Sequence, residues 1–175
     1  MSVGVWLLNS VSILVPPTRF YRQKSWCWRV LGFDISPTAR IVSSCKIWAD
    51  GDVHIGDDSF IGHDSLIIAS GGMAVNIGVS CDISSRVLIT TGSHEIDMLG
   101  DHSAGQGLSE AITIKDGVWI GIGSIVLGGV TVGEKSIIAA GSVVTTDIPA
   151  YVIAGGVPCR PIKRWDKKSQ SWVQL

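Results

Sequence analysis

Residues that could perform acid–base chemistry gather in one segment of the chain. The segment 90–111, TTGSHEIDMLGDHSAGQGLSEA, contains His94, Glu95, Asp97, Asp101 and His102. An imidazole has an ordinary pKa of about 6.5, so it can accept a proton at neutral pH. We therefore predict that His94, which follows the apolar run 87–91, is a general base. A solvated loop histidine is the alternative interpretation.

Metal chemistry has less support in the sequence. The four histidines, His54, His63, His94 and His102, do not share a ligand-like spacing, and the four cysteines form no CxxC pair. A zinc site needs three or four converging ligands, so we expect no metal. The scattered cysteines also argue against a disulfide scaffold. We expect reduced, buried thiols in a cytosolic protein, with Cys45 and Cys81 in packing positions.

An aliphatic repeat supplies the elements that must position these residues. Isoleucine or valine recurs every six positions, as in Ile114, Ile120, Val126, Val132, Ile138 and Val144. A period of six differs from the 3.6 of a helix and the 2 of a strand, and indicates a short strand plus a turn. Three such units can close a triangular coil, and stacked coils would form a β-solenoid. The alternative is a β-sandwich, whose strands recur at about 8–12 residues.

The repeat divides the chain into segments. Residues 34–158 form the solenoid, interrupted by an excursion loop at 90–111. Residues 1–33 contain three tryptophans, four basic residues and no acid, and we expect one or two helices broken at Pro16-Pro17. The favoured role of 1–33 is a cap on the open coil, and the alternative is peripheral docking on an anionic membrane. Residues 159–175 form a basic, poorly patterned C-terminal extension.

Composition narrows the classes of partner. The chain has 175 residues, with 14 Lys+Arg against 15 Asp+Glu and a net charge of -1. This balance argues against a dedicated nucleic-acid binder, which usually has a basic excess. The apolar run 2–15 is too short to span a bilayer and lacks the marks of a signal peptide.

Longer stretches of sequence resemble a known family. The six-residue repeat, the TTGSH segment and the run VWIGIGSIVLGGVTVGEKSIIAAGSVVTTDIPAYVIAGGVPCRPI are similar to the hexapeptide-repeat acyltransferases. The resemblance covers about residues 33–164, and the nearest subgroup is the galactoside, maltose and polysaccharide O-acetyltransferases. It implies an all-β, left-handed parallel β-helix of about five coils. It also implies a homotrimer with active sites between subunits, and direct acetyl transfer from acetyl-CoA to a hydroxyl or amine.

The resemblance also implies roles for individual residues. His94 matches the family's catalytic base, although Ser93 stands between it and the preceding glycine. Four residues would bind the acceptor or line the site: Asp64, Glu95, Asp97 and Trp119. Five would contact acetyl-CoA: Ala140, Thr145, Thr146, Arg160 and Lys163. Outside the resemblance, Asp64 is equally well a solvated corner residue, and Arg160 and Lys163 part of a solvated basic tail.

These features predict an acetyl-CoA-dependent O-acetyltransferase that acts on a sugar or a surface-polysaccharide precursor. An N-acetyltransferase of a nucleotide-linked amino sugar, or of an antibiotic, would use the same base and co-substrate. A non-catalytic solenoid scaffold is the alternative from another class. We expect a cytoplasmic protein, with contact at the inner face of the membrane if residues 1–33 dock there.

Overall fold

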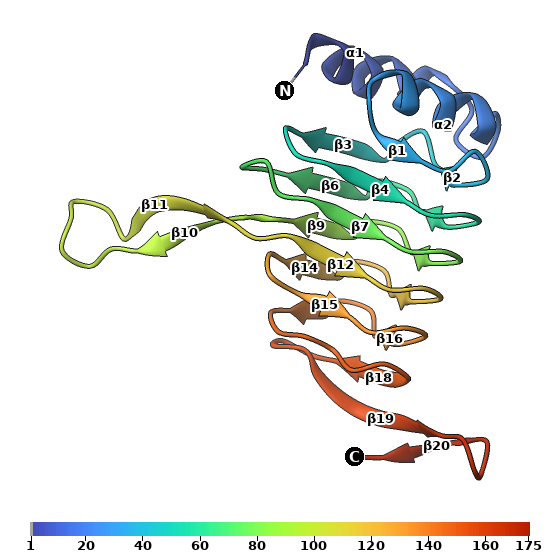
Figure 1. Ribbon diagram of the computed structural model, residues 1–175, viewed down its shortest axis with the longest axis vertical. Coiled ribbons are helices and arrows are strands. Elements are labelled where there is room, and N and C mark those ends of the chain that lie inside the picture. The colour runs from blue at the N-terminus through green and yellow to red at the C-terminus, as the bar shows by residue number, and fades with distance from the viewer. Residues whose placement is uncertain (1) are drawn as a thin grey trace.

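The computed structural model describes residues 2–175, and its main body is a three-sided solenoid (Figure 1). Three parallel sheets form the sides, and each coil contributes one strand to each sheet. Sheet A contains β1 (Asp34–Ile35), β4 (Val53–Ile55), β7 (Val75–Ile77), β12 (Ile112–Ile114) and β15 (Thr131–Val132). Sheet C contains β3 (Lys46–Ala49), β6 (Leu66–Ala69), β9 (Leu88–Thr90), β14 (Ile125–Leu127) and β17 (Val143–Val144).

Sheet B closes the third side and continues beyond the other two. Its parallel strands are β2 (Arg40–Ile41), β5 (Phe60–Ile61), β8 (Asp82–Ile83), β13 (Trp119–Ile120), β16 (Ile137–Ile138) and β18 (Val152–Gly155). The chain runs through sheets A, B and C in turn, and the coil is left-handed as it descends from the N-terminal end (Figure 1). The predicted left-handed β-helix of about five coils is therefore confirmed.

The core is a set of stacked aliphatic columns, one for each sheet. In sheet A the register places Ile35, Ile55, Ile77, Ile114 and Val132 in line. Ile55, Ile77 and Val132 have no exposed surface, and Ile35 and Ile114 have almost none. Because the strands are parallel and in register, the six-residue period becomes a continuous apolar column along the axis.

Small residues at the corners let the coils approach one another. Ser59, Ser65, Ser124, Ser136 and Ser142 are buried there, and each hydroxyl donates to a backbone carbonyl. Gly56 lies so close to the next coil that an added Cβ would be 2.7 Å from the backbone of Gly78. Any larger side chain at Gly56 would force the two coils apart.

Two helices cover the first coil, as the sequence predicts. They are α1 (Val3–Val11) and α2 (Tyr21–Val30), joined through the 3-10 turn η1 (Ser12–Leu14). The side chain of buried Asn9 donates to the carbonyl of Ile47 and accepts from its N–H, at 2.8 and 3.0 Å. Ser25 donates similarly to the carbonyl of Ala39. The helices therefore supply hydrogen-bond partners that a preceding coil would otherwise provide.

Two segments expected to be irregular contain strands. The excursion at 90–111 is an antiparallel ribbon of β10 (Gly92–Ile96) and β11 (Ala104–Ser109), which projects from the solenoid (Figure 1). The extension at 159–175 contains β19 (Arg160–Asp166) and β20 (Ser171–Gln174), which continue sheet B in antiparallel fashion. Neither segment carries the six-residue period, because its strands pair back on the chain instead of stacking as coils.

Candidate active site

The ribbon leaves the solenoid at the edge where a strand of sheet C passes to sheet A, here called the C–A edge. Its base is held by Thr91, which is 1% exposed and whose hydroxyl accepts the N–H of Ser70 at 2.7 Å. The carbonyl of Thr91 accepts the N–H of Glu110 at 3.0 Å. Both strands of the ribbon are therefore anchored where they join the solenoid, although the ribbon itself is exposed.

The orientation of His94 identifies its basic nitrogen. Its Nδ1 lies 3.0 Å from the carbonyl oxygen of Gly105 on the facing strand. A carbonyl can only accept, so Nδ1 carries the proton and donates it. The other nitrogen, Nε2, is then the acceptor of the neutral imidazole. Gly107 pairs with His94 and leaves open space where a side chain would lie. The imidazole is thus oriented by the backbone with Nε2 available.

The two acids on the ribbon are placed differently from His94. Glu95 follows His94 in β10 and is exposed; alternation along a strand directs it to the opposite face of the ribbon. Asp97 lies at the tip, where one carboxylate oxygen accepts the N–H groups of Leu99 and Gly100, both at 2.9 Å. These hydrogen bonds lower the pKa of Asp97. Asp97 therefore organises the turn, and its other oxygen remains for a ligand.

Trp119 lies on the outer face of sheet B. It is half exposed, as the alternation along β13 predicts, and its indole Nε1 donates to the hydroxyl of Ser84 at 3.2 Å. Ser84 stands where the chain turns from sheet B to sheet C, here called the B–C edge. Asp64 lies on the same edge one coil earlier, with a positive φ of 57°, and its N–H donates to Ser44.

The five residues predicted to contact acetyl-CoA fall on two sides of the solenoid. Ala140 is exposed on the B–C edge, and Arg160 pairs with Gly155 on the following turn of that edge. Lys163 is exposed on β19, opposite Ile153. Thr145 and Thr146 are exposed on the C–A edge, directly after β17.

A single chain therefore does not bring all the predicted residues together. The C–A edge carries His94, Glu95, Asp97, Thr145 and Thr146. The B–C edge, or the surface beside it, carries Asp64, Trp119, Ala140 and Arg160. Each edge is continuous along the axis because the coils are stacked in register. Within one chain, therefore, the two groups of residues stay on separate edges.

Three contributors were missed in the sequence. Gly105 supplies the carbonyl that orients His94, Gly107 leaves space beside the ring, and Ser84 holds the indole of Trp119. The AGQG sequence at 104–107 was a usable signal, since small residues opposite a histidine suggest room for a substrate. It could be used only if the segment were recognised as a paired ribbon.

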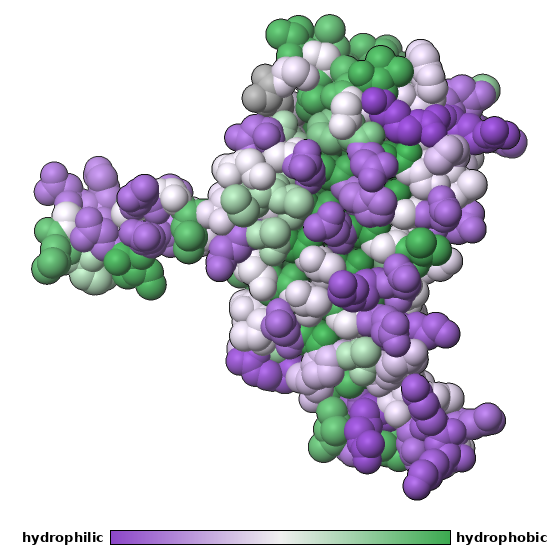
Figure 2. All heavy atoms as spheres, viewed as in Figure 1, coloured by the Kyte–Doolittle hydropathy of each residue, from purple (hydrophilic) through white to green (hydrophobic). Residues whose placement is uncertain are grey.

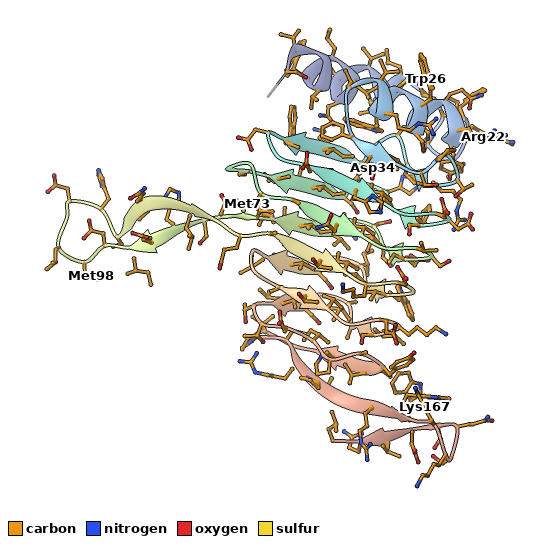
Figure 3. All side chains as sticks on the ribbon, in the orientation of Figure 1. Arg22, Trp26, Asp34, Met73, Met98 and Lys167 are labelled. Atoms are coloured by element: carbon orange, nitrogen blue, oxygen red, sulfur yellow. The ribbon has the colours of Figure 1, made fainter. Side chains whose placement is uncertain are left out.

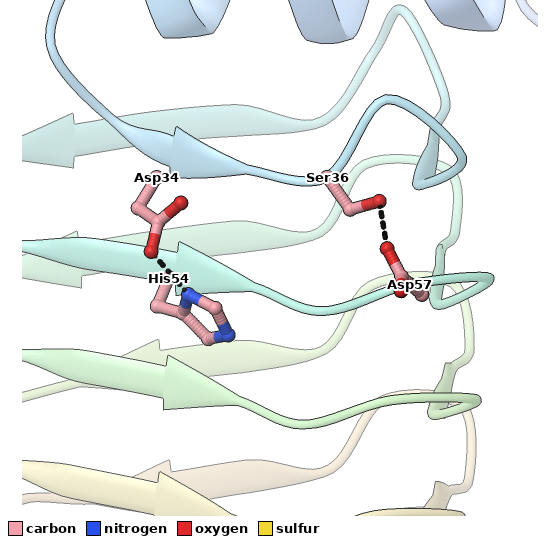
Figure 4. A network of polar contacts seen from close by, with 4 residues as sticks. All are labelled: Asp34, Ser36, His54 and Asp57. Carbon is pink, nitrogen blue, oxygen red and sulfur yellow. Dashed lines mark hydrogen bonds and ion pairs between the residues drawn. The ribbon is translucent and has the colours of Figure 1, made fainter.

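The remaining histidines have separate surroundings. His54 Nδ1 lies 2.7 Å from a carboxylate oxygen of Asp34 on sheet A (Figure 4), and His63 contacts the hydroxyl of Ser44. His102 lies in the exposed tip of the ribbon. Within residues 2–175, no group of three or more His, Cys, Asp or Glu side chains is arranged to hold a metal ion.

The cysteines are free thiols and do not approach the ribbon. Cys45, Cys81 and Cys159 are buried, whereas Cys27, on α2, is only partly buried and corrects the expectation that all four are enclosed. Burial raises the pKa of Cys45 to about 12. It also raises the pKa of Cys81 and that of Cys159, where a hydrogen bond with Ser142 and the charge of Arg160 act in the opposite direction. These thiols stay protonated at neutral pH and act as packing groups.

Comparison with known proteins identifies the class to which this fold belongs. Residues 111–146 match the family model described as bacterial transferase hexapeptide (six repeats). The chain is 38% identical over 149 residues to a Schizosaccharomyces pombe protein provisionally named an acetyltransferase, covering 85% of this chain and 70% of that protein. The chain therefore belongs to the hexapeptide-repeat acetyltransferases.

Two further relatives carry more specific names. The chain is 34% identical over 124 residues to galactoside O-acetyltransferase of Escherichia coli, covering 69% of this chain and 58% of the relative. It is 28% identical over 160 residues to WcaF of Escherichia coli, which is provisionally named a colanic acid biosynthesis acetyltransferase, covering 90% and 84%. The chain thus spans less than two thirds of the galactoside enzyme but most of WcaF.

A solved structure supports the fold. A maltose O-acetyltransferase from Clostridium difficile superposes with a TM-score of 0.70 and 28% sequence identity, covering 94% of this chain and 87% of that one. The superposition includes nearly the whole chain and therefore extends beyond the stretch matched by the family model.

Proposed function

We propose that this protein transfers an acetyl group from acetyl-CoA to a hydroxyl group of a sugar or saccharide precursor, with His94 as the general base. The observation that carries the proposal is the orientation of His94. Its Nδ1 is held by the carbonyl of Gly105, which leaves Nε2 as the nitrogen free to accept a proton. A base held in one tautomer on an otherwise open ribbon is what proton abstraction from a hydroxyl requires.

The reaction follows directly from that arrangement. Nε2 of His94 takes the proton of the acceptor hydroxyl while its oxygen bonds to the thioester carbonyl carbon. The carbon–sulfur bond then breaks, and the departing CoA thiolate recovers the proton from the imidazolium. During the transfer, the carbonyl of Gly105 stabilises the added positive charge through the bond from Nδ1–H. Positioning of the two substrates contributes much of the acceleration.

A homotrimer with shared sites accounts for the separation of the predicted residues. The C–A edge carries His94 and the B–C edge carries Trp119, so a neighbouring copy must bring the second edge to the first. The ribbon itself also points to a partner, because Ile96, Met98 and Leu99 are each at least 77% exposed near its tip. A two-stranded ribbon is only marginally stable alone in water, and packing against another copy would cover these side chains.

Acetyl-CoA is proposed to bind along both edges near the C-terminal end of the solenoid. Arg160 and Lys163 would pair with phosphate groups, for which guanidinium and ammonium groups are suited. The guanidinium of Arg160 already donates one bond to the carbonyl of Cys159, which orients it and leaves further donors. Thr145, Thr146 and the backbone at Ala140 would bind the extended arm that carries the thioester.

The acceptor class is supported by the relatives that act on saccharides. Galactoside O-acetyltransferase and the maltose O-acetyltransferase are named for sugars, and WcaF is named for the biosynthesis of a polysaccharide. On this chain, Asp64, Glu95 and the free oxygen of Asp97 are the carboxylates proposed to accept hydrogen bonds from sugar hydroxyls.

The test is product analysis with acetyl-CoA and a panel of oligosaccharides and nucleotide-linked amino sugars. Mass spectrometry should find O-acetylated product, and His94→Ala should lower turnover by about 10²–10⁴-fold, the usual contribution of a general base. His102→Ala, on the same ribbon, is the matched control and should retain turnover. An N-acetylated product would replace the proposed acceptor class. Retained turnover in His94→Ala, or absence of CoA binding by calorimetry, would refute the mechanism.

A further inference from the structure

The N-terminal end of the solenoid has an apolar surface that remains exposed in the described residues 2–175. The inner side of α1 packs on the first coil through Val5 and Asn9, which are 2% and 5% exposed. Its outer side is largely apolar as well: Val3, Trp6, Leu7 and Val11 are all exposed, beside Ser10, whose hydroxyl donates to the carbonyl of Trp6. The spacing of three, four and eight residues from Val3 places them on one face of the helix. A water-soluble surface helix usually presents polar residues on that face.

The second helix extends this surface. Trp26 and Val30 are exposed on α2, and Trp26 points away from the solenoid (Figure 3). A groove between the helices is lined by Leu7, Val11, Trp26 and Val30, among others. Ile13 and Leu14, in the connecting turn, are 66% and 80% exposed. Because both helices lie across the end of the solenoid, these side chains form one apolar end surface (Figures 1 and 2).

The charged residues of the helical segment itself have one sign. The first acidic residue of the chain is Asp34, whereas Arg19, Arg22, Lys24 and Arg29 precede it. Lys24 is buried, and its ammonium donates to the carbonyl of Pro17 and the hydroxyl of Ser43; burial lowers its pKa. Arg19 and Arg22 are exposed, and Arg22 extends from the end of α2 into solvent (Figure 3). The end surface therefore combines exposed tryptophans with free guanidinium groups.

We propose that this end surface binds an anionic lipid bilayer as a peripheral contact. Apolar side chains would enter the headgroup region, tryptophans would lie at the interface, and arginines would pair with lipid phosphates. None of the helices in residues 2–175 is long and apolar enough to cross a membrane, so the helices would lie in the plane of the interface. A second copy is a poorer occupant, since end-to-end contact would bring like charges together.

This contact would also set the height of the ribbon above the bilayer. The ribbon leaves the third coil, and coils are about 4.8 Å apart, so His94 would stand roughly 20 Å from the apolar end surface when the helix layer is included. A saccharide attached to a lipid would be presented at such a height. This consequence rests on the proposed function, whereas the membrane contact does not.

The experiment is co-sedimentation of the full chain with vesicles of phosphatidylcholine, with and without phosphatidylglycerol, at low and high salt. The protein should sediment with the anionic vesicles and be released by salt. The double variant Trp6→Glu/Trp26→Glu should lose the apolar contact, and Arg19→Glu/Arg22→Glu should lower partitioning by more than about tenfold. Leu175→Glu, which adds an acid at the exposed C-terminal end, should bind as the wild type does.

Three results would overturn the proposal. One is the absence of sedimentation with anionic vesicles at low salt. Another is equal binding by the wild type and Trp6→Glu/Trp26→Glu, with circular dichroism showing that both are folded. The third is an end-to-end dimer in sedimentation velocity that Trp26→Glu dissociates, which would identify a second copy as the occupant. His94→Ala should bind vesicles normally, so failure of the proposed chemistry and failure of membrane docking are distinguishable.

Discussion

Two isoleucines seven positions apart show how differently the solenoid and the ribbon are built. Ile89, in β9, has no exposed surface and stacks between Ile67 and Val126 in the sheet C column. Ile96, at the end of β10, is 83% exposed. Each inner coil has a neighbour above and below, whereas each strand of the ribbon has only the other strand. The solenoid thus buries its core within a single chain, whereas the apolar side chains near the ribbon tip stay exposed and are proposed to pack against another copy.

The coils and the ribbon also differ in what they contribute: the coils provide stability, and the ribbon carries the proposed base. The coils hold the two edges at fixed positions through repeated packing, and their interior contains no group suited to catalysis. The ribbon carries His94 on an open surface where a substrate can reach it. A residue that reacts must be accessible, and a residue that stabilises a column must be enclosed, so the proposed chemistry and the stabilising core occupy different parts of the molecule.

The largest effect on stability should come from shortening a buried isoleucine. Ile89→Ala removes methyl groups from a position with neighbours on every side, and we expect a loss of about 2–5 kcal/mol in the free energy of unfolding. Chemical denaturation at several protein concentrations measures it. The loss should be the same at each concentration, because the column lies within one chain.

The corresponding substitution on the ribbon tests whether Ile96 contacts another copy of the chain. Ile96→Ala should leave the packing of the coils unchanged and weaken association between copies, so that its melting temperature falls only in dilute samples. Sedimentation equilibrium gives the oligomer fraction directly. If Ile96→Ala instead lowered stability equally at all concentrations, the ribbon would be part of the single-chain core and the proposed subunit contact would be wrong.

A smaller effect should appear at high pH through Cys45. Its pKa is raised to about 12 in the folded state, above its ordinary value of 9.0. The folded protein therefore retains a proton that the unfolded chain releases, and stability is unaffected below pH 9. Between pH 9 and 12 the thiol should lower stability by up to about 1.4 kcal/mol per pH unit.

The measurement compares the wild type with Cys45→Ala across that range. Subtracting the two denaturation series isolates the thiol from tyrosine and lysine, which titrate in the same interval. Cys27→Ala, in a partly exposed position on α2, is the matched control. Parallel pH profiles for wild type and Cys45→Ala would show that water reaches the solenoid interior.

The smallest effect should be confined to the tip of the ribbon. Asp97→Ala removes the acceptor for the N–H groups of Leu99 and Gly100, and amide hydrogen exchange at both should quicken. Because the pKa of Asp97 is lowered in the folded state, the wild type should lose the same protection as pH falls through that lowered value. The melting temperature should not change. Slower exchange, or a general loss of stability, would contradict a purely local role.

The sequence was most informative where one interaction is repeated. The six-residue period predicted the direction of Ile61, Ile83 and Ile120, and these side chains form the sheet B column. It also predicted that Trp119 points outward, since it precedes a buried isoleucine. The segment 90–111 followed no period, so its pairing into β10 and β11 could not be read from it. The turn between these strands is held by hydrogen bonds to Asp97, which no periodic pattern marks.

The solenoid could be predicted from the sequence alone, because each coil repeats the same inward aliphatic residues and the same small residues at its corners. The sequence also marked His94 as the residue with the chemistry of a base. Only the tertiary structure decided which nitrogen of His94 is free, since Gly105 is eleven residues away and meets the ring through antiparallel pairing. It also decided that Trp119 and His94 lie on different edges. The period of the sequence indicates whether a side chain is buried or exposed. The position of two side chains relative to each other depends on how the chain closes into coils.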